Sequence, residues 1–196
     1  YIAIRGGIDV PLVLGSRSFC QRGAFGGGFG RPLKGGDALV LTRMVEREPV
    51  LEPWSSSHRL PLRGPWEVRV IAGPQQDAFA QDALQRLTAT ACRVTPEIDR
   101  MGLRMETPGL RLQPQEILTV PMTAGAIQVT PSSGLIVLHV DHQSTGGYPV
   151  VATVIDADLP LLAQARPGDT VRFRGVDHVE ADRARRRLTG WLELDQ

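Results

Sequence analysis

Residues 135–155 of this chain run LIVLHVDHQSTGGYPVVATVI. The apolar runs at the two ends, residues 135–138 and 150–155, predict two buried β-strands joined by a short polar loop. The pair Gly146-Gly147 exposes backbone N–H groups and lets a ligand approach the main chain closely. Five consecutive polar residues precede these glycines, which is more than a turn requires. The loop is therefore the first candidate for a functional site.

Short runs of valine, isoleucine and leucine recur along the whole chain, separated by 15 prolines and 21 glycines. This pattern favours a mainly β barrel or sandwich with a few short helices. Trp66–Ala72 is the clearest strand, because large apolar residues alternate there with more polar ones. Other strands are predicted at residues 1–5, 38–44, 91–95, 104–107, 115–119, 126–130, 135–140, 150–155 and 170–174. Helices are predicted at residues 75–90, 159–165 and 179–188.

Composition excludes several classes of function. With 22 Lys+Arg against 21 Asp+Glu, the near-zero net charge argues against nonspecific nucleic-acid binding. Cys20 and Cys92 lack CxxC spacing, so they are typical of reduced cysteines in a cytosolic protein. No apolar run approaches the roughly 18 residues that a membrane span needs, and no signal peptide is visible. We therefore expect a cytoplasmic protein that binds neither nucleic acid nor membrane.

Eight short motifs, in order, carry a resemblance to a known family. They are Gly6–Pro11, Leu14–Ser18, Gly26–Leu33, Gly73-Pro74, Asp99–Arg104, Gly125–Val129, the loop Asp141–Pro149, and Asp158-Leu159 followed by Pro167-Gly168-Asp169. The chain resembles the KipA-like family of allophanate hydrolase subunit 2. This family includes the C subunit of bacterial 5-oxoprolinase and the carboxyltransferase part of urea carboxylase.

The resemblance implies a tandem of two related cyclophilin-like β-barrels. On that basis residues 67–176 form the second barrel and residues 1–45 the remainder of the first. Residues 46–66 are then a linker, as their prolines and serines also indicate, and residues 177–196 are a helical tail. We expect that roughly the first third of the family fold lies on a missing N-terminal part, which is one expected partner.

Three functions follow from the resemblance. The first is ATP-dependent opening of 5-oxoproline to glutamate, performed with a KipI-like partner, allophanate hydrolase subunit 1. The second is carboxyl transfer from carboxybiotin to urea or a related amide. The third is a regulator that binds a kinase-inhibitory protein without catalysis. No Met-Lys pair for biotin attachment occurs, so biotin would be carried on another protein, and the ATP-dependent 5-oxoprolinase is favoured.

Arg100 and Arg104 flank Gly102 in the Asp99–Arg104 motif. The guanidinium fork suits recognition of a carboxylate or phosphate, so both arginines are candidate substrate-binding residues. The alternative is a structural ion pair between Asp99 and one of the arginines, which would hold a tight loop.

Gln128 is a polar residue among apolar neighbours. By strand alternation it shares a face with Ala126 and Thr130, which we expect to be the concave face of the barrel. There its amide could hold a urea-like or lactam group through paired donor and acceptor bonds. Alternatively it satisfies buried backbone groups.

The loop supplies the remaining candidates. Two histidines and a carboxylate, His139, His142 and Asp141, suggest a metal site. A third ligand at a suitable spacing is not evident among them, so we expect no metal site here. Acid–base catalysis by His142 or Asp141 fits their place at the loop mouth better. The family commonly has arginine or another polar residue where His142 stands, which weakens its claim. The candidate catalytic residues are Asp141, His142 and Gln143, and the candidate ligand-binding residues of the loop are Thr145, Gly146, Gly147 and Tyr148.

Overall fold

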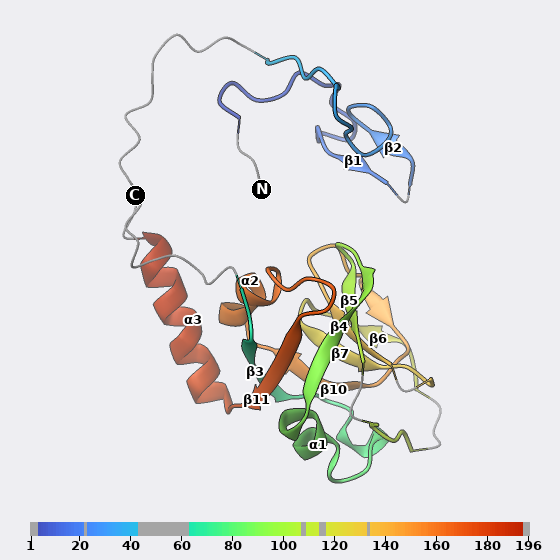
Figure 1. Cartoon of the computed structure of the whole chain (residues 1–196), viewed down its shortest axis with the longest axis vertical. Coiled ribbons are helices and arrows are strands. Elements are labelled where there is room, and N and C mark those ends of the chain that lie inside the picture. The colour runs from blue at the N-terminus through green and yellow to red at the C-terminus, as the bar shows by residue number, and fades with distance from the viewer. Residues whose placement is uncertain are drawn as a thin grey trace. The chain divides into compact units, whose positions relative to one another are not determined.

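The computed structural model describes residues 4–21, 23–42, 63–106, 109–113, 117–132 and 134–193. The chain divides into two compact units, Tyr1–Trp54 and Ser55–Gln196 (Figure 1). In the first unit, β1 (Phe19–Cys20) pairs antiparallel with β2 (Phe25–Gly26). The strand predicted at residues 38–44 is wrong over its described part, where a single bridge joins Leu41 to Ile8. Most of the strand predicted at residues 1–5, and the linker up to residue 62, lie outside the described residues.

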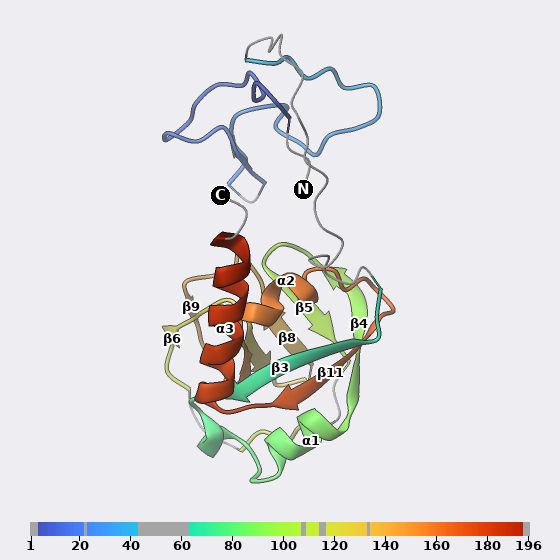
Figure 2. The ribbon, with the colours of Figure 1, turned by 90° about the vertical axis from the view of Figure 1, so that its left-hand side faces the viewer.

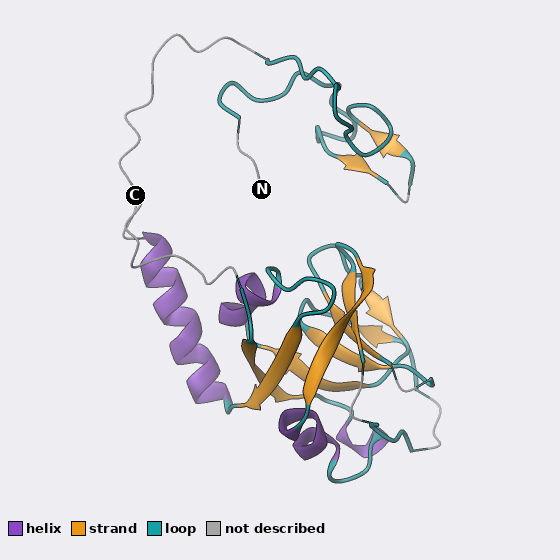
Figure 3. Ribbon diagram, in the orientation of Figure 1, coloured by secondary structure: helices purple, strands orange, loops and turns teal. Residues whose placement is uncertain are grey.

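The second unit contains a closed seven-stranded barrel with the strand order β10-β3-β11-β4-β5-β8-β7. Parallel pairing occurs between β3 and β11, and the other neighbouring strands are antiparallel. Strands dominate this unit (Figure 3), which confirms the prediction of a mainly β barrel. The strands are β3 (Trp66–Ala72), β4 (Ala91–Ile98), β5 (Gly102–Met105), β7 (Ala126–Val129), β8 (Leu135–Leu138), β10 (Val150–Val154) and β11 (Thr170–Gly175).

The barrel interior is filled by alternate residues of these strands. Trp66, Val68 and Val70 of β3 are fully buried, as the period of two predicted. Val171 lies opposite Trp66, and Phe173 lies opposite Val68, so the parallel pair contributes matched layers of side chains to the core. Burial of this apolar surface is the main stabilising contribution to the barrel.

In the part of the unit that the structure describes, three α-helices lie on the outside of the barrel: α1 (Ala83–Ala89), α2 (Leu159–Leu162) and α3 (His178–Glu193). Figure 2 shows α3 running along the barrel beside β3 and α2. The helix predicted at residues 75–90 is confirmed in its second half, which is α1, and wrong in its first half, where a 3-10 turn, η2 (Gln76–Ala78), is followed by extended backbone at Phe79. Phe79 instead forms a bridge with Leu112, which a helix could not do.

A buried ion pair between Arg69 and Asp158 connects the segment before α2 to strand β3 of the barrel. Asp158 ends the 3-10 turn η3 (Asp156–Asp158) and is 5% exposed. Its Oδ2 accepts hydrogen bonds from Arg69 N at 2.7 Å and Arg69 Nε at 2.9 Å, and its Oδ1 accepts from Arg69 Nη2 at 2.6 Å. Each carboxylate oxygen is therefore satisfied by β3, and the pair raises the pKa of the Arg69 guanidinium.

A two-stranded ribbon lies apart from the barrel sheet. It pairs β6 (Val120–Pro121) with β9 (Thr145–Gly146), so that Val120 lies opposite Gly146. The strand predicted at residues 115–119 is wrong over its described part, because pairing begins only at Val120. The ribbon contains the glycine end of the loop that the sequence singled out.

Candidate functional site

The loop after β8 is hydrogen-bonded to the turn between β4 and β5. His139 N donates to Met101 O at 2.9 Å, and Asp141 N donates to Arg100 O at 2.8 Å. Asp99 closes that turn, since its Oδ1 accepts from Met101 N at 2.8 Å and from Gly102 N at 3.1 Å. The carboxylate of Asp99 thus stabilises this turn by accepting bonds from backbone N–H groups.

Arg100 and Asp141 form an ion pair across these two segments. Arg100 Nη2 donates to Asp141 Oδ1 at 3.0 Å, and Arg100 Nε donates to the other oxygen. Both side chains are exposed, at 60% and 50%. The hydrogen bond from Arg100 lowers the pKa of the Asp141 carboxyl, so Asp141 is an anion at neutral pH and not a general acid. Asp141 thus fits the role of a positioning carboxylate.

The two histidines of the loop differ in tautomer. His139 is half-buried and its Nδ1 accepts a bond from Val140 N at 2.9 Å, so its proton lies on Nε2. Burial, and then the charge of Arg100, lower the pKa of His139, although Asp141 opposes this. His142 Nδ1 lies 2.7 Å from Gln143 O, which can only accept. The neutral His142 ring therefore presents an unprotonated Nε2, as a general base requires.

Gln128 lies beneath the ribbon and is only 1% exposed. Its Nε2 is 3.3 Å from Tyr148 O and 3.5 Å from Met122 Sδ, and its Oε1 is 3.4 Å from Gln143 Nε2. These contacts are long for hydrogen bonds, so the buried amide is weakly satisfied. The structure thus brings together Gln128, Gln143 and the backbone of Tyr148.

Gln128 shares a face with Ala126, as predicted, but the prediction that this is the concave face of the barrel is wrong. Its neighbours Ile127 and Val129 belong to the barrel core, whereas Ala126 packs in a small separate cluster with Leu138, Val150, Met122 and Ile136. Gln128 therefore points out of the barrel, into the layer between the sheet and the ribbon. The sequence left two interpretations of Gln128 open, a ligand-binding amide and an amide that satisfies buried backbone groups. The contact of its Nε2 with Tyr148 O agrees with the second interpretation.

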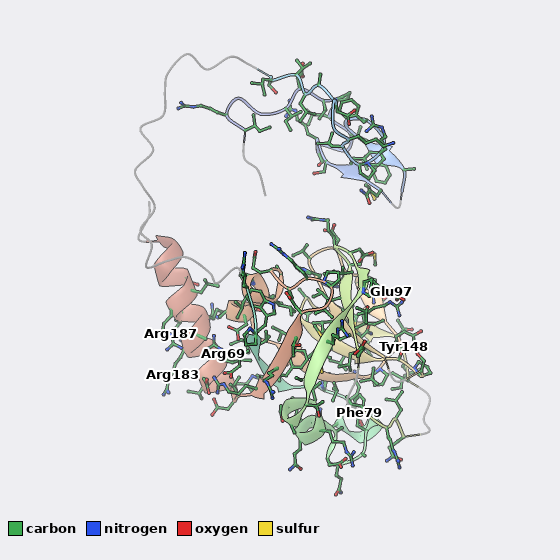
Figure 4. All side chains as sticks on the ribbon, in the orientation of Figure 1. Arg69, Phe79, Glu97, Tyr148, Arg183 and Arg187 are labelled. Atoms are coloured by element: carbon green, nitrogen blue, oxygen red, sulfur yellow. The ribbon has the colours of Figure 1, made fainter. Side chains whose placement is uncertain are left out.

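Arg104 is separated from the loop. It lies opposite Ile136, which lies opposite Gln128, so the three occupy one row across β5, β8 and β7. Two strand spacings, about 10 Å, separate the Cα atoms of Arg104 and Gln128. Arg104 Nε pairs instead with Glu97 Oε2 at 2.9 Å, on the exposed outer surface. Figure 4 labels Glu97 and Tyr148 at separate places on that side of the barrel.

The remaining loop candidates lie at the surface. Thr145, Gly147 and Tyr148 are exposed, and Gly146 is partly covered. Sequence reasoning missed Met122, whose N donates to Ser144 O at 2.9 Å and whose side chain packs beside Gln128. The strand before Met122, β6, has only two residues, which is too short to show an alternating pattern in the sequence. Within the described ranges, no group of three or more His, Cys, Asp or Glu side chains is placed to hold a metal ion.

Comparison with known proteins identifies the family of this chain. Residues 1–175 match the family described as carboxyltransferase domain, subdomain A and B. The chain belongs to this family. It is 36% identical over 194 residues to the C subunit of 5-oxoprolinase from Haemophilus influenzae and 33% identical over 196 residues to that from Escherichia coli, covering 98% of this chain in both. It spans 61% of the length of each of these two relatives.

The chain is also similar to urea amidolyases. The chain is 31% identical to the urea amidolyase of Lachancea kluyveri, over 92% of this chain and 11% of that protein. The crystal structure of the Kluyveromyces lactis urea amidolyase is similar with a TM-score of 0.73 and 29% identity, covering 92% of this chain and 12% of that one. Among the described residues, no helix has the length and apolar character that crossing a membrane demands.

Proposed function

We propose that the protein is a subunit of an ATP-dependent 5-oxoprolinase, which opens 5-oxoproline to glutamate and acts together with a KipI-like subunit. The likeness to the C subunit of 5-oxoprolinase over nearly the whole chain supports this function. The observation that carries it is the pair of amide side chains, Gln128 and Gln143, beside a glycine-rich loop. A lactam presents a carbonyl next to an N–H, and an amide side chain offers the complementary donor and acceptor.

Each residue has a separate task in this proposal. Gln143, which is half-buried, and the backbone at Gly147 bind the lactam, while the buried Gln128 holds Gln143 in place from behind. Nε2 of His142 takes a proton from the attacking water. Arg100 binds the substrate carboxylate by exchanging one of its bonds to Asp141. In the overall reaction one water adds to the lactam carbon, the bond from this carbon to the ring nitrogen breaks, and the nitrogen takes up a proton. A second water is consumed as ATP is split to ADP and phosphate.

A carboxyltransferase acting on urea or a similar amide is the second candidate. The family description and the likeness to urea amidolyases favour it. Biotin would have to be attached outside residues 1–196, since the sole lysine of this sequence, Lys34, follows Leu33 and not a methionine. A regulator that binds a kinase inhibitor without catalysis is the third candidate, and it predicts that substitutions in the loop leave partner binding intact.

The test is 5-oxoproline-dependent ATP hydrolysis by the whole protein, reconstituted with its KipI-like and lactam-handling subunits. We expect turnover that requires this protein and that Gln143→Ala abolishes. Arg183→Gln is the matched control, because Arg183 is an exposed residue of α3 that takes no part in the loop. If the complex assembles without turnover and instead transfers carboxyl groups from carboxybiotin to urea, the second candidate replaces the first.

A further inference from the structure

The segments that lead into β3 and β11 enclose a hollow on the barrel surface. Its volume is about 470 Å³, and it is lined by residues 63–65 on one side and by Arg166 and residues 168–170 on the other. Because β3 and β11 are parallel, with Val171 opposite Trp66, the residues before these strands come to the same end of the barrel. We call it the arginine hollow, after Arg63 and Arg166.

The turn before β11 uses its own polar groups for folding. Oδ2 of Asp169 accepts bonds from Trp66 Nε1 at 3.0 Å and from Arg166 N at 2.9 Å, which lower the pKa of the Asp169 carboxyl. Gly168 N donates to Val94 O, and Asp169 N donates to Arg166 O, each at 2.9 Å. These two backbone donors are already bonded within the fold, and the charged donors that the lining offers a ligand are the side chains of Arg63 and Arg166.

The two arginines of the hollow form no close salt bridge. Arg63 and Arg166 are exposed, and among the described residues neither guanidinium lies within salt-bridge distance of a carboxylate, although the charge of Arg166 contributes to lowering the pKa of Asp169. Asp169 is the single acidic residue in the lining, and its Oδ2 is bound by two N–H donors. The lining therefore has a net positive charge.

The charged residues on the neighbouring strands do not change the sign of the net charge of the hollow. Arg93 lies opposite Thr170 across β4 and β11. Glu106 follows β5 on the other side of Arg93, where Glu106 N donates to Arg93 O at 2.9 Å. Neither Arg93 nor Glu106 lines the hollow, and their charges are opposite, so the positive charge of the lining comes from Arg63 and Arg166.

We propose that the arginine hollow is an oxyanion site that binds a phosphate group. Two guanidinium groups offer two forks of N–H donors, whereas a carboxylate has two oxygens and fills only one fork. Inorganic phosphate and a terminal phosphate group have at least three outer oxygens and carry about −1.5 to −2 charges at neutral pH, which suits two arginines. Inorganic phosphate and the phosphates of a nucleotide share this chemistry. Naming the nucleotide as ATP rests on the proposed function.

Isothermal titration calorimetry of the whole protein without its partners tests this site. The probes are inorganic phosphate, ATP and adenosine at low ionic strength, where exposed charges are least screened. We expect Arg63→Gln and Arg166→Gln each to weaken phosphate or ATP binding roughly tenfold, since a charge-assisted bond contributes about that much. The controls Arg183→Gln and Arg187→Gln remove the same charge from the outer side of α3, where both side chains point away from the barrel (Figure 4).

The outcomes separate this site from the proposed function. Binding of both phosphate and ATP, weakened only by the hollow variants, supports a phosphate site, and binding of ATP alone identifies a nucleotide as its source. Failure of both phosphate and ATP to bind at millimolar concentration, or an equal loss of binding in the α3 controls, overturns the proposal, as does adenosine binding as tightly as ATP. Unchanged thermal unfolding shows that the variants are folded. Intact phosphate binding without 5-oxoproline turnover contradicts the proposed function and not the site.

Discussion

A Cβ atom placed on Gly146 would lie only 2.8 Å from Nε2 of Gln128. The glycine therefore lets the ribbon backbone lie directly on the buried amide, and Met122 closes the contact from the side, with its Cγ 3.2 Å from the same point. Gln128 is 1% exposed, so its amide has little room to move aside. The closeness of these two residues determines how the loop lies on the barrel.

Replacement of Gly146 by alanine tests this contact. We expect Gly146→Ala to lift the ribbon, lower the free energy of unfolding by about 1–3 kcal/mol, and reduce turnover by the proposed enzyme. Gly147→Ala is the matched control for stability, since the nearest atom to its Cβ would be Thr119 Oγ1 at 3.8 Å. Chemical denaturation measures both. Adding Gln128→Ala to Gly146→Ala should recover part of the loss, and strictly additive losses would contradict a direct contact.

The Arg100–Asp141 pair allows a test of function that is separate from stability. Both side chains are largely exposed, so we expect Asp141→Asn to change the free energy of unfolding by less than about 1 kcal/mol. If Asp141 positions Arg100 for the substrate, the same change should raise KM for 5-oxoproline more than it lowers kcat. Steady-state kinetics of the assembled enzyme gives both constants. An unchanged KM would leave Asp141 with a structural role only.

The pKa of His139 provides a readout of the same pair. Burial and Arg100 lower this pKa, and Asp141 raises it, so we expect Asp141→Asn to lower it further. A pKa lowered on folding means that His139 favours the native state above its unfolded pKa of about 6.5, and this contribution is lost as pH falls through the native pKa. NMR titration of the His139 ring follows the shift. A higher pKa in the variant would show that Asp141 does not act on His139.

The barrel strands were predictable because one face of each enters a common core. Alternation in Trp66–Ala72 located β3 to the residue, and the apolar runs at residues 135–140 and 150–155 located β8 and β10 within two residues at each end. The sequence alone was enough to locate a strand wherever apolar and polar residues alternated without interruption.

Contacts that are distant in sequence account for the errors. β7 is buried on both faces, by the core and by the ribbon, so alternation could not tell which side Gln128 occupies. The helical stripe at residues 75–90 is interrupted because Phe79 pairs with Leu112. Arg100 and Arg104 are close in sequence, yet they pair with Asp141 and Glu97 respectively. Such partners cannot be identified from the motif alone.

The two cysteines should differ sharply in reactivity. Cys92 is buried on β4, and this burial raises the pKa of its thiol to about 11, whereas Cys20 is exposed. Because the thiolate is the nucleophile, we expect one cysteine to react with a thiol reagent in the native protein and both to react in denaturant. Cys20→Ser should abolish the native reaction. Rapid reaction of Cys92 in that variant would show that the barrel opens at β4.

The buried Arg69–Asp158 pair should be the most sensitive polar contact in the barrel. Asp158→Ala leaves the Arg69 guanidinium half-buried without its carboxylate, and we expect a loss of about 3–5 kcal/mol in the free energy of unfolding. Asp182→Ala is the matched control, because Asp182 also binds arginines, at 2.7 Å from both Arg185 and Arg186, but on the exposed side of α3. That change should cost less than about 1 kcal/mol.

A double variant separates the charge of Arg69 from the packing around it. Replacing both partners, as Arg69→Met with Asp158→Leu, removes the uncompensated charge and should be less destabilising than Asp158→Ala alone. Urea denaturation followed by circular dichroism compares the three proteins. The backbone N–H of Arg69, which donates to Asp158 Oδ2, loses its acceptor in both variants, so it cannot account for the difference between them. Equal losses would assign the cost to that N–H and not to the buried charge.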